Sequence, residues 1–131
     1  MSTIDTESRN AACDAVTAMV DAGAGPGTFT VLDGETPLVV WTLEEQAFGA
    51  ASNGQAALAG TPKTASAVAT GTADNYQIAD SDGNVRISGA VVQGDPNSPT
   101  PDTLTMVNTS ITSGQQVSLG AFVHEQPAST E

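Results

Sequence analysis

The sequence is poor in cysteine and histidine, and these shortages argue against several kinds of site. Cys13 is the only cysteine among 131 residues, so the chain can build no internal disulfide, thiolate-rich metal site or paired redox motif. We expect it to pack as a small apolar side chain. His124 is the only histidine, and a zinc site needs three or four ligands that the chain cannot assemble.

Basic residues are also scarce. Lys and Arg together number 3 against 15 Asp and Glu, which gives a formal net charge of −12. Nucleic-acid binding needs clustered cations, so it is not expected. Such a charge opposes a compact state unless salt screens it, and at molar salt the Debye length falls to about 3 Å. With few lysines and small apolar residues, the composition favours a salt-loving organism or its virus over an ordinary acidic protein.

Long apolar runs are absent, so the sequence predicts neither a signal segment nor a membrane span. We therefore expect the protein to remain in an aqueous compartment. Its length suits one domain spanning 1–131 without metal or disulfide support. Alanine and valine make up much of the apolar content, which indicates a core of small side chains. The large aromatic anchors are Phe29, Trp41, Phe48, Tyr76 and Phe122.

One helix is predicted near the start of the chain, over about residues 8–22. Apolar residues recur there at three- and four-residue spacing, and the run of glycines and proline at 23–27 ends the pattern. Asp5, Thr6 and Ser8 are candidate N-caps. The expected apolar stripe consists of Ala12, Val16, Met19 and Val20.

After Gly27 the pattern changes to short β-branched runs separated by turn residues, which is typical of hairpins. The strongest hairpin signal lies around Asp80–Gly83, and the polar, proline-rich stretch at 94–102 predicts an exposed loop. We expect the last two strands to pair with each other across Ser113 and Gly114. The predicted strands cover residues 28–32, 38–43, 48–51, 55–58, 65–70, 75–79, 84–92, 104–111 and 117–124.

Strands at intervals of about ten residues favour an antiparallel β-sandwich or jelly roll, with the helix lying outside it. The sandwich should occupy about 28–125, and the tail at 126–131 is expected to be loose.

The sequence offers no set of catalytic residues. His124 and Glu125 are adjacent and could form an acid–base or metal pair, but a surface position at a strand end is the favoured interpretation. Glu44 and Glu45 are also adjacent, and neighbouring strand residues point to opposite faces, so a solvated loop is expected. The nucleophile-elbow, phosphate-loop and dinucleotide motifs are missing. We therefore predict a non-enzymatic protein without a cofactor.

Two short motifs leave weaker possibilities. Asp80, Asp82 and Asn84 place oxygen ligands on alternate residues, like the first half of a calcium loop. The second half of that pattern is absent, so a hairpin turn is favoured, with a weak, exposed cation site as the alternative. Asn108 begins an N-glycosylation sequon within a predicted strand, where we do not expect it to be used.

Six segments of the chain carry a family resemblance, namely Arg9–Val16, Ala47–Gly54, Thr70–Ala73, Asp80–Gly83, Asn108–Val117 and Ala121–Val123. They resemble small structural proteins encoded in the genomes of tailed bacteriophages and of halophilic archaeal tailed viruses. The resemblance runs through most of the chain, which departs from the pattern at Tyr76 and in the proline-rich loop. It implies a virion component assembled in the host cytoplasm, and the acidic surface fits a host living in high salt.

These features predict a capsid decoration, cement or turret subunit that binds the major capsid protein and forms a homo-oligomer. One alternative is a component of the tail, baseplate or head-to-tail connector. Another, of a different class, is a carbohydrate- or receptor-binding module, which would need exposed aromatic rings. Trp41 and Tyr76 could serve there, but both lie in strand patterns where a core role is favoured. Neither membrane nor nucleic-acid partners are expected.

Overall fold

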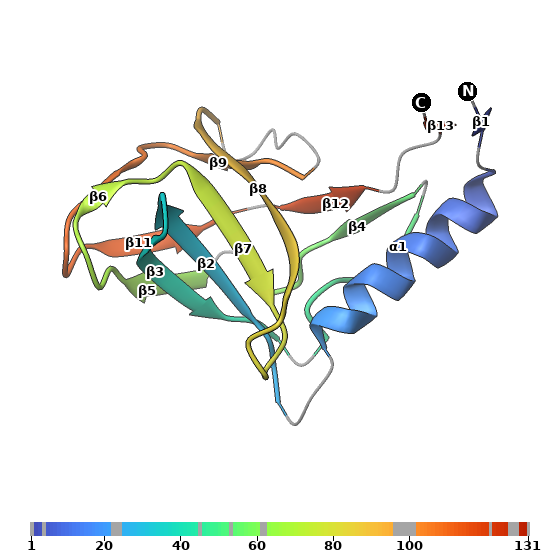
Figure 1. The fold of residues 1–131 in the computed structure, drawn as a ribbon, viewed down its shortest axis with the longest axis horizontal. Helices are drawn as coiled ribbons and strands as arrows, with labels where there is room; N and C mark the ends of the chain where they lie inside the picture. Colours follow the sequence, from blue (N-terminus) through green and yellow to red (C-terminus); the bar gives the residue numbers. More distant parts are fainter. Residues whose placement is uncertain are drawn as a thin grey trace.

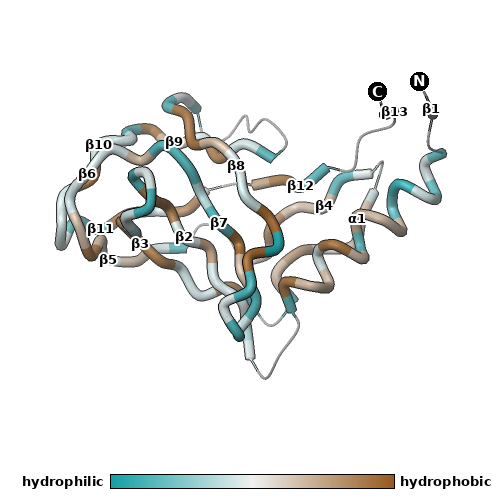
Figure 2. The backbone as a smooth tube through the Cα atoms, viewed as in Figure 1, coloured by the Kyte–Doolittle hydropathy of each residue, from teal (hydrophilic) through white to brown (hydrophobic). Residues whose placement is uncertain are grey.

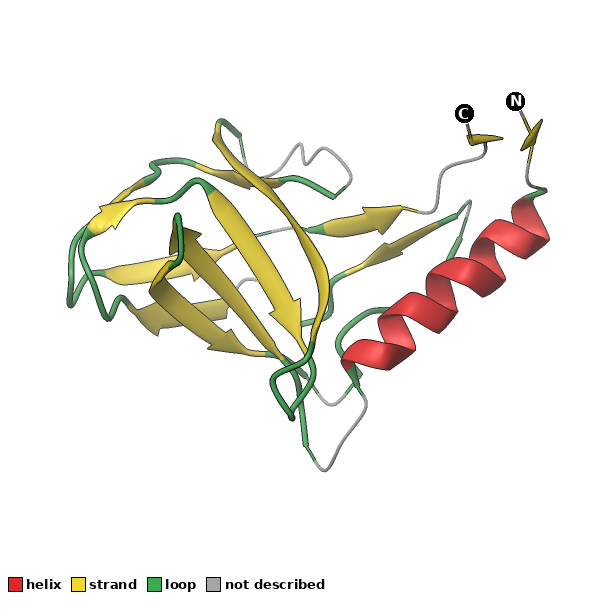
Figure 3. Ribbon diagram, in the orientation of Figure 1, coloured by secondary structure: helices red, strands yellow, loops and turns green. Residues whose placement is uncertain are grey.

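The computed structural model describes residues 2–3, 5–21, 25–44, 46–52, 54–60, 63–95, 102–120, 122–125 and 129–130. The chain is mainly β with one helix near its N-terminus (Figures 1 and 3), as predicted. The elements are β1 (Ser2–Thr3), α1 (Thr6–Val20), β2 (Thr28–Asp33), β3 (Thr36–Thr42), β4 (Gln55–Ala57), β5 (Lys63–Ser66), β6 (Gly71–Thr72), β7 (Asn75–Ala79), β8 (Val85–Gln93), β9 (Leu104–Met106), β10 (Ser110–Ile111), β11 (Gln116–Leu119), β12 (Val123–Glu125) and β13 (Ser129–Thr130).

The helix begins and ends two residues earlier than predicted. Asp5 is the N-cap, and its Oδ1 accepts a hydrogen bond from the Ser8 backbone N–H at 2.7 Å. This bond satisfies one of the backbone donors left open in the first turn. Figure 2 shows that hydrophilic residues gather at this N-terminal end.

The buried face of α1 differs from the predicted stripe. Cys13, Thr17 and Val20 are buried, Val16 is partly buried, and Met19 is 44% exposed. Thr17 can occupy this face because its hydroxyl donates to the Asp14 carbonyl at 3.2 Å. The expectation that Met19 packs inward is therefore wrong, whereas the expected burial of Cys13 is confirmed. Short side chains at 13 and 17 let the helix approach its neighbours closely.

Five strands form the central sheet, in the order β3-β2-β7-β8-β9. All neighbours are antiparallel except β8 and β9, which are parallel. The predicted hairpin between β7 and β8 is confirmed, and its turn is hydrophilic in Figure 2. The expected loop between β2 and β3 is shorter than predicted, because Asp33 pairs with Thr36 and leaves a two-residue turn in which Gly34 has a φ of +60°.

Shorter strand pairs complete the structure. β5 pairs with β11, β6 with β10 and β4 with β12, each antiparallel. Figure 1 shows the central sheet curling, with β5 and β11 behind it and the β4–β12 ribbon extending toward α1. This arrangement agrees with the predicted antiparallel, sandwich-like class. The segment expected to be a strand at 48–51 instead makes one isolated bridge, from Phe48 to Leu58, and Ser52 just after it makes another, to Gln55.

The expected pairing of 104–111 with 117–124 is wrong. The first segment divides into β9, which pairs with β8, and β10, which pairs with β6. The second divides into β11 and β12, which pair with β5 and β4. Strand alternation indicates which residues face inward but does not identify the partner strand, and here long-range partners replace the neighbour in sequence.

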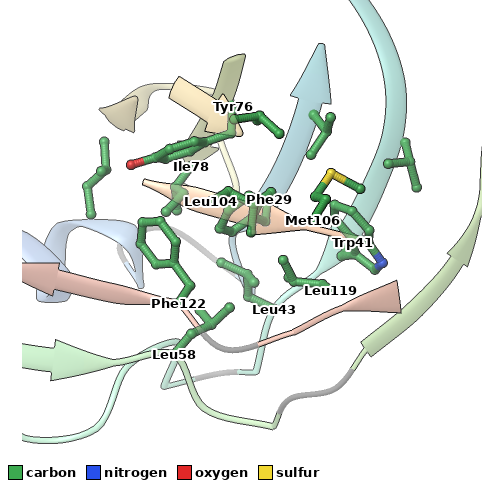
Figure 4. Close-up of a cluster of buried hydrophobic side chains, with 14 of the residues drawn as sticks. Phe29, Trp41, Leu43, Leu58, Tyr76, Ile78, Leu104, Met106, Leu119 and Phe122 are labelled. Atoms are coloured by element: carbon green, nitrogen blue, oxygen red, sulfur yellow. The ribbon is translucent and has the colours of Figure 1, made fainter. Parts of the chain in front are cut away.

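The core is built around the five aromatic rings. Phe29 stacks on Tyr76 with ring centroids 5.2 Å apart and meets Trp41 and Phe122 edge-on. Figure 4 shows these rings among apolar side chains from several strands. Trp41 and Tyr76 are 1% and 0% exposed, respectively, so their predicted core role is confirmed. The Trp41 indole Nε1 donates to the Val117 carbonyl at 3.2 Å, linking β3 to β11.

Some predicted features fall outside the described residues. These are residues 96–101 of the proline-rich loop, Glu45, and positions 126–128 and 131 of the tail. Within the tail, Ser129 and Thr130 pair antiparallel with Ser2 and Thr3. None of the helices in the described part of the chain has the length and apolar character needed to span a membrane.

Candidate functional site

The strongest candidate site lies around His124 on β12. The predicted surface position is wrong, because only 12% of the His124 side chain is exposed. Its Nδ1 lies 2.7 Å from Oδ1 of Asp102. The partner is therefore Asp102, 22 residues earlier in the chain, and not the adjacent Glu125. The side chain of Glu125 instead accepts a hydrogen bond from Gln55 Nε2 at 2.9 Å, across the β4–β12 ribbon.

Asp102 is held in place by both its backbone and its side chain. Its N–H donates to the Val123 carbonyl at 2.8 Å, and its Oδ2 accepts from the Glu125 N–H at 3.2 Å. Its own carbonyl accepts from the Tyr76 hydroxyl at 2.7 Å. Asp102 has a φ of +60°, a conformation that is uncommon for residues other than glycine. These contacts hold the end of the 94–102 segment against β7 and β12.

Burial affects the ionisable groups around this cluster. It raises the pKa of the Tyr76 hydroxyl far above its ordinary value, and the negative charge of Asp102 adds to the effect. Burial likewise raises the pKa of the Cys13 thiol, with smaller contributions from Asp14 and Asp102. The Cys13 Sγ lies 3.7 Å from the His124 carbonyl oxygen. Tyr76 and Cys13 are therefore neutral packing groups near pH 7, and Cys13 is not an activated nucleophile.

An Asp–His pair can serve acid–base chemistry when the second ring nitrogen reaches a substrate or nucleophile. Here Nε2 of His124 is completely buried and has no hydrogen-bond partner within the described residues. The atom that would exchange a proton with a substrate is thus closed off from solvent. In this arrangement the pair links β12 to the segment ending at Asp102.

Sequence reasoning missed Asp102 as a functional position. It lies at the end of a polar, proline-rich segment, where an exposed loop residue is the natural expectation. The available signal was that His124 lies within a strand pattern and near the apolar Phe122 and Val123. A buried histidine requires a hydrogen-bond partner, but the sequence does not indicate which distant carboxylate supplies it.

The turn between β7 and β8 contains the residues considered for a cation. Asp80 is buried, and its carboxylate accepts hydrogen bonds from the Asp82 and Asn84 backbone N–H groups, each at 3.0 Å. Arg86 Nη2 also donates to it, at 2.9 Å. Burial taken separately raises the pKa of Asp80, but these hydrogen bonds outweigh it and the net pKa is lowered.

The Asp80 carboxylate is therefore already satisfied by protein donors, and a cation at Asp80, Asp82 and Asn84 would have to displace Arg86. Across the described residues, no three His, Cys, Asp or Glu side chains gather closely enough to hold a metal ion.

Two other motifs have local structural roles. Glu44 is half exposed and pairs with Lys63 at 2.9 Å. Asn108 lies in the turn between β9 and β10 and not in a strand, contrary to the prediction, and its side-chain oxygen accepts from the Ser110 N–H at 2.9 Å.

Comparisons with protein-family models, with curated proteins and with solved structures give no match for this chain.

Proposed function

We propose that this chain is a non-enzymatic structural subunit of a tailed-virus particle, which binds the major capsid lattice as a decoration, cement or turret protein. The placement of His124 carries the non-enzymatic part of the proposal. The chain has one histidine, its Nδ1 is bonded to Asp102, and its Nε2 is buried. The group best suited to proton transfer at neutral pH is thus used to hold the fold together.

The viral part of the proposal rests on the resemblance of the segments described above. A structural subunit requires complementary surfaces but no reactive site. Several outward positions of the central sheet fit contact with another protein, because Thr28, Thr30, Gln77 and Ser88 are uncharged although the chain carries a formal charge of −12. The exposed Arg86 on β8 is charged, but it is paired with the Asp80 carboxylate. Such a face can approach a neighbour at little electrostatic cost.

The buried rings count against a carbohydrate- or receptor-binding module built on Trp41 or Tyr76. Both rings pack against Phe29 in the core, so neither can stack on a sugar without unfolding the sheet. A tail, baseplate or connector component remains the alternative within the viral class, and copy number distinguishes it from a capsid decoration.

The test is quantitative mass spectrometry of purified virus particles, measuring copies of this protein relative to the major capsid protein. A copy number proportional to the capsomers supports a decoration or turret. A copy number sufficient for only one ring per particle assigns the protein to the tail or connector. Complete absence from particles rejects the virion proposal. An alanine variant of His124 that folds normally should still be incorporated, because the proposal gives that residue no contact with a partner.

A further inference from the structure

The outer face of the central sheet carries no acidic side chain between the ends of its strands. Val40, Thr30, Gln77 and Ser88 pair one with the next across β3, β2, β7 and β8, and directly paired residues lie on the same face of a sheet. Every second neighbour along a strand shares that face. Figure 1 shows it turned toward the viewer, on the side away from β5 and β11. We call it the neutral face, and it consists of Thr28, Thr30, Val40, Thr42, Gln77, Ser88, Ala90 and Val92.

Two valines on the neutral face are exposed, although alternate residues of the same strands form the core. Val40 on β3 is 41% exposed and Val92 on β8 is 44% exposed. Between these strands, Thr30 and Gln77 are partly exposed on β2 and β7 and carry a hydroxyl and a carboxamide. Such a surface can bury apolar area and exchange hydrogen bonds without burying an unpaired charge.

Acidic side chains lie at both ends of the strands that form the neutral face. Asp33 and Glu35 are at the β2–β3 turn, and Asp80 and Asp82 are in the β7–β8 turn. Because β7 runs antiparallel to β2, the two turns lie at opposite ends of the sheet. Arg86, at the border of the face, is paired with the Asp80 carboxylate at 2.9 Å. A negatively charged molecule is therefore repelled at both ends of the strands and least repelled over the neutral face.

We propose that the neutral face binds the same face of a second copy of this chain, and that the two copies form a two-fold dimer by packing sheet on sheet. A two-fold contact presents the same surface on both sides, so uncharged side chains meet uncharged side chains and neither copy buries an unpaired charge. A strongly basic partner would find no carboxylate on this face with which to pair. Charge thus favours a second copy over a partner recognised by opposite charge.

The acidic ends of the strands also select the crossing angle of the two sheets. Packed sheets cross at about 30° or at about 90°. A crossing near 30° would place the acidic turns of one copy against those of the other. A crossing near 90° places the turns of each copy beyond the β3 and β8 edges of its partner, and Thr30 and Gln77 of the two copies meet at the centre. We therefore infer the crossing near 90°.

The dimer should be weak. The neutral face is smaller than the roughly 20–30 residues that each side of a stable interface uses, and each copy carries a formal charge of −12. Association should therefore require high protein concentration, and it should strengthen as salt screens the repulsion between the copies. This inference does not depend on the proposed viral role.

Sedimentation equilibrium of the full chain tests the proposal, over protein concentrations from micromolar to millimolar and in both low salt and molar potassium chloride. We expect a monomer–dimer equilibrium whose dimer fraction rises with protein concentration and with salt. A monomer at every concentration and salt overturns the proposal. Association that weakens as salt is added also overturns it, because that response indicates attraction between opposite charges.

Two substitutions of nearly unchanged side-chain shape test the location. Gln77→Glu places a negative charge on each copy at the centre of the neutral face, and it should weaken dimerisation by about tenfold or more. Gln116→Glu is the matched control, because Gln116 is exposed on β11, outside the neutral face. Far-ultraviolet circular dichroism checks that both variants fold. A Q116E variant that weakens dimerisation as much as Q77E overturns the location.

NMR spectra of the wild type recorded at increasing protein concentration locate the contact without any substitution. We expect the amide signals of Thr30, Gln77 and Ser88 to shift with concentration, while those of β11 stay in place. Shifts confined to β11 or to α1 would assign self-association to another surface and overturn the proposal.

Discussion

At the scale of single residues, the protein's few chemically versatile side chains form internal hydrogen bonds. The Asp80 carboxylate accepts hydrogen bonds from backbone N–H groups of its own turn and from Arg86. The Asp102 carboxylate contacts His124 Nδ1 and accepts a hydrogen bond from the Glu125 N–H, and the Asp102 carbonyl accepts one from the Tyr76 hydroxyl. In an acidic chain with 3 Lys and Arg residues, most carboxylates cannot find a cation, so backbone N–H groups serve as partners. These carboxylates define loop geometry in a way that composition does not reveal.

Asp80 should contribute to stability in a pH-dependent way. Because its pKa is lowered in the folded state from an ordinary value of 3.8, its contribution is fully present above about pH 4. That contribution is lost as the pH falls through the folded pKa. Asp80→Asn should therefore reduce the free energy of unfolding at pH 7 and flatten the acid side of the stability curve. Urea unfolding at a series of pH values measures both effects.

Asp82→Asn is the matched control, since it makes the same charge change on the same turn at an exposed side chain. It should leave the free energy of unfolding near that of the wild type at pH 7. Equal losses in the two variants would show that the turn senses net charge and not the Asp80 hydrogen bonds.

Tyr76 should affect the dependence of the free energy of unfolding on pH at the alkaline end. Burial and the charge of Asp102 raise its folded pKa above the ordinary value of 10.0, so the unfolded chain ionises first. Stability should then fall as the pH rises above about 10. Tyr76→Phe should cost about 1 kcal/mol at pH 7 through loss of the bond to the Asp102 carbonyl and should lessen the alkaline fall. An unchanged alkaline slope in Y76F would assign that slope to other groups.

At the scale of elements, a glycine on β8 permits the approach of the Asp102 segment. A Cβ at Gly89 would lie 2.8 Å from both the Asp102 carbonyl oxygen and the Tyr76 hydroxyl oxygen. Neither atom can move without breaking the hydrogen bond between them. Gly89 is therefore needed for close packing of β8 against the end of the 94–102 segment.

Gly89→Ala should reduce the free energy of unfolding by about 1–3 kcal/mol, the usual cost of overpacking. Gly25→Ala is the control, because a Cβ there meets nothing within 4 Å. That variant should stay within about 0.5 kcal/mol of the wild type. Chemical denaturation followed by circular dichroism gives both values, and a G89A variant as stable as G25A would contradict the packing argument.

Elements that depend on neighbours in sequence were predictable, and those that depend on distant partners were not. The β7–β8 hairpin follows from alternating residues around Asp80–Gly83, and the helix follows from its period and its Asp5 cap. By contrast, the pairing of β11 with β5 joins strands about fifty residues apart, and short polar-apolar runs do not distinguish among several possible partners. For the same reason the His124–Asp102 pair could not be found, although burial of Trp41 and Tyr76 could.

At the scale of the whole molecule, the charge is the dominant feature. The core is made of small and aromatic side chains, while exposed acids populate the turns and the helix, including Glu7, Asp14, Glu35 and Asp82. Like charges on so small a body repel one another, and the repulsion is greater in the folded state than in an expanded chain. Screening by salt should thus favour folding.

The melting temperature should therefore rise markedly between low salt and molar potassium chloride. At low salt the screening length exceeds the spacing of neighbouring surface charges, whereas at 1 M it falls to about 3 Å and isolates them. Thermal unfolding followed by circular dichroism at several salt concentrations measures the effect.

The double variant Glu35→Lys, Asp82→Lys changes the formal charge by +4, from −12 to −8, at two exposed positions. If charge repulsion is the cause, this variant should melt higher at low salt and gain less from added salt. A wild-type melting temperature that does not change with salt would remove the physical basis for a high-salt habitat, and an equal rise in both proteins would assign the effect to salt-strengthened burial of the apolar core.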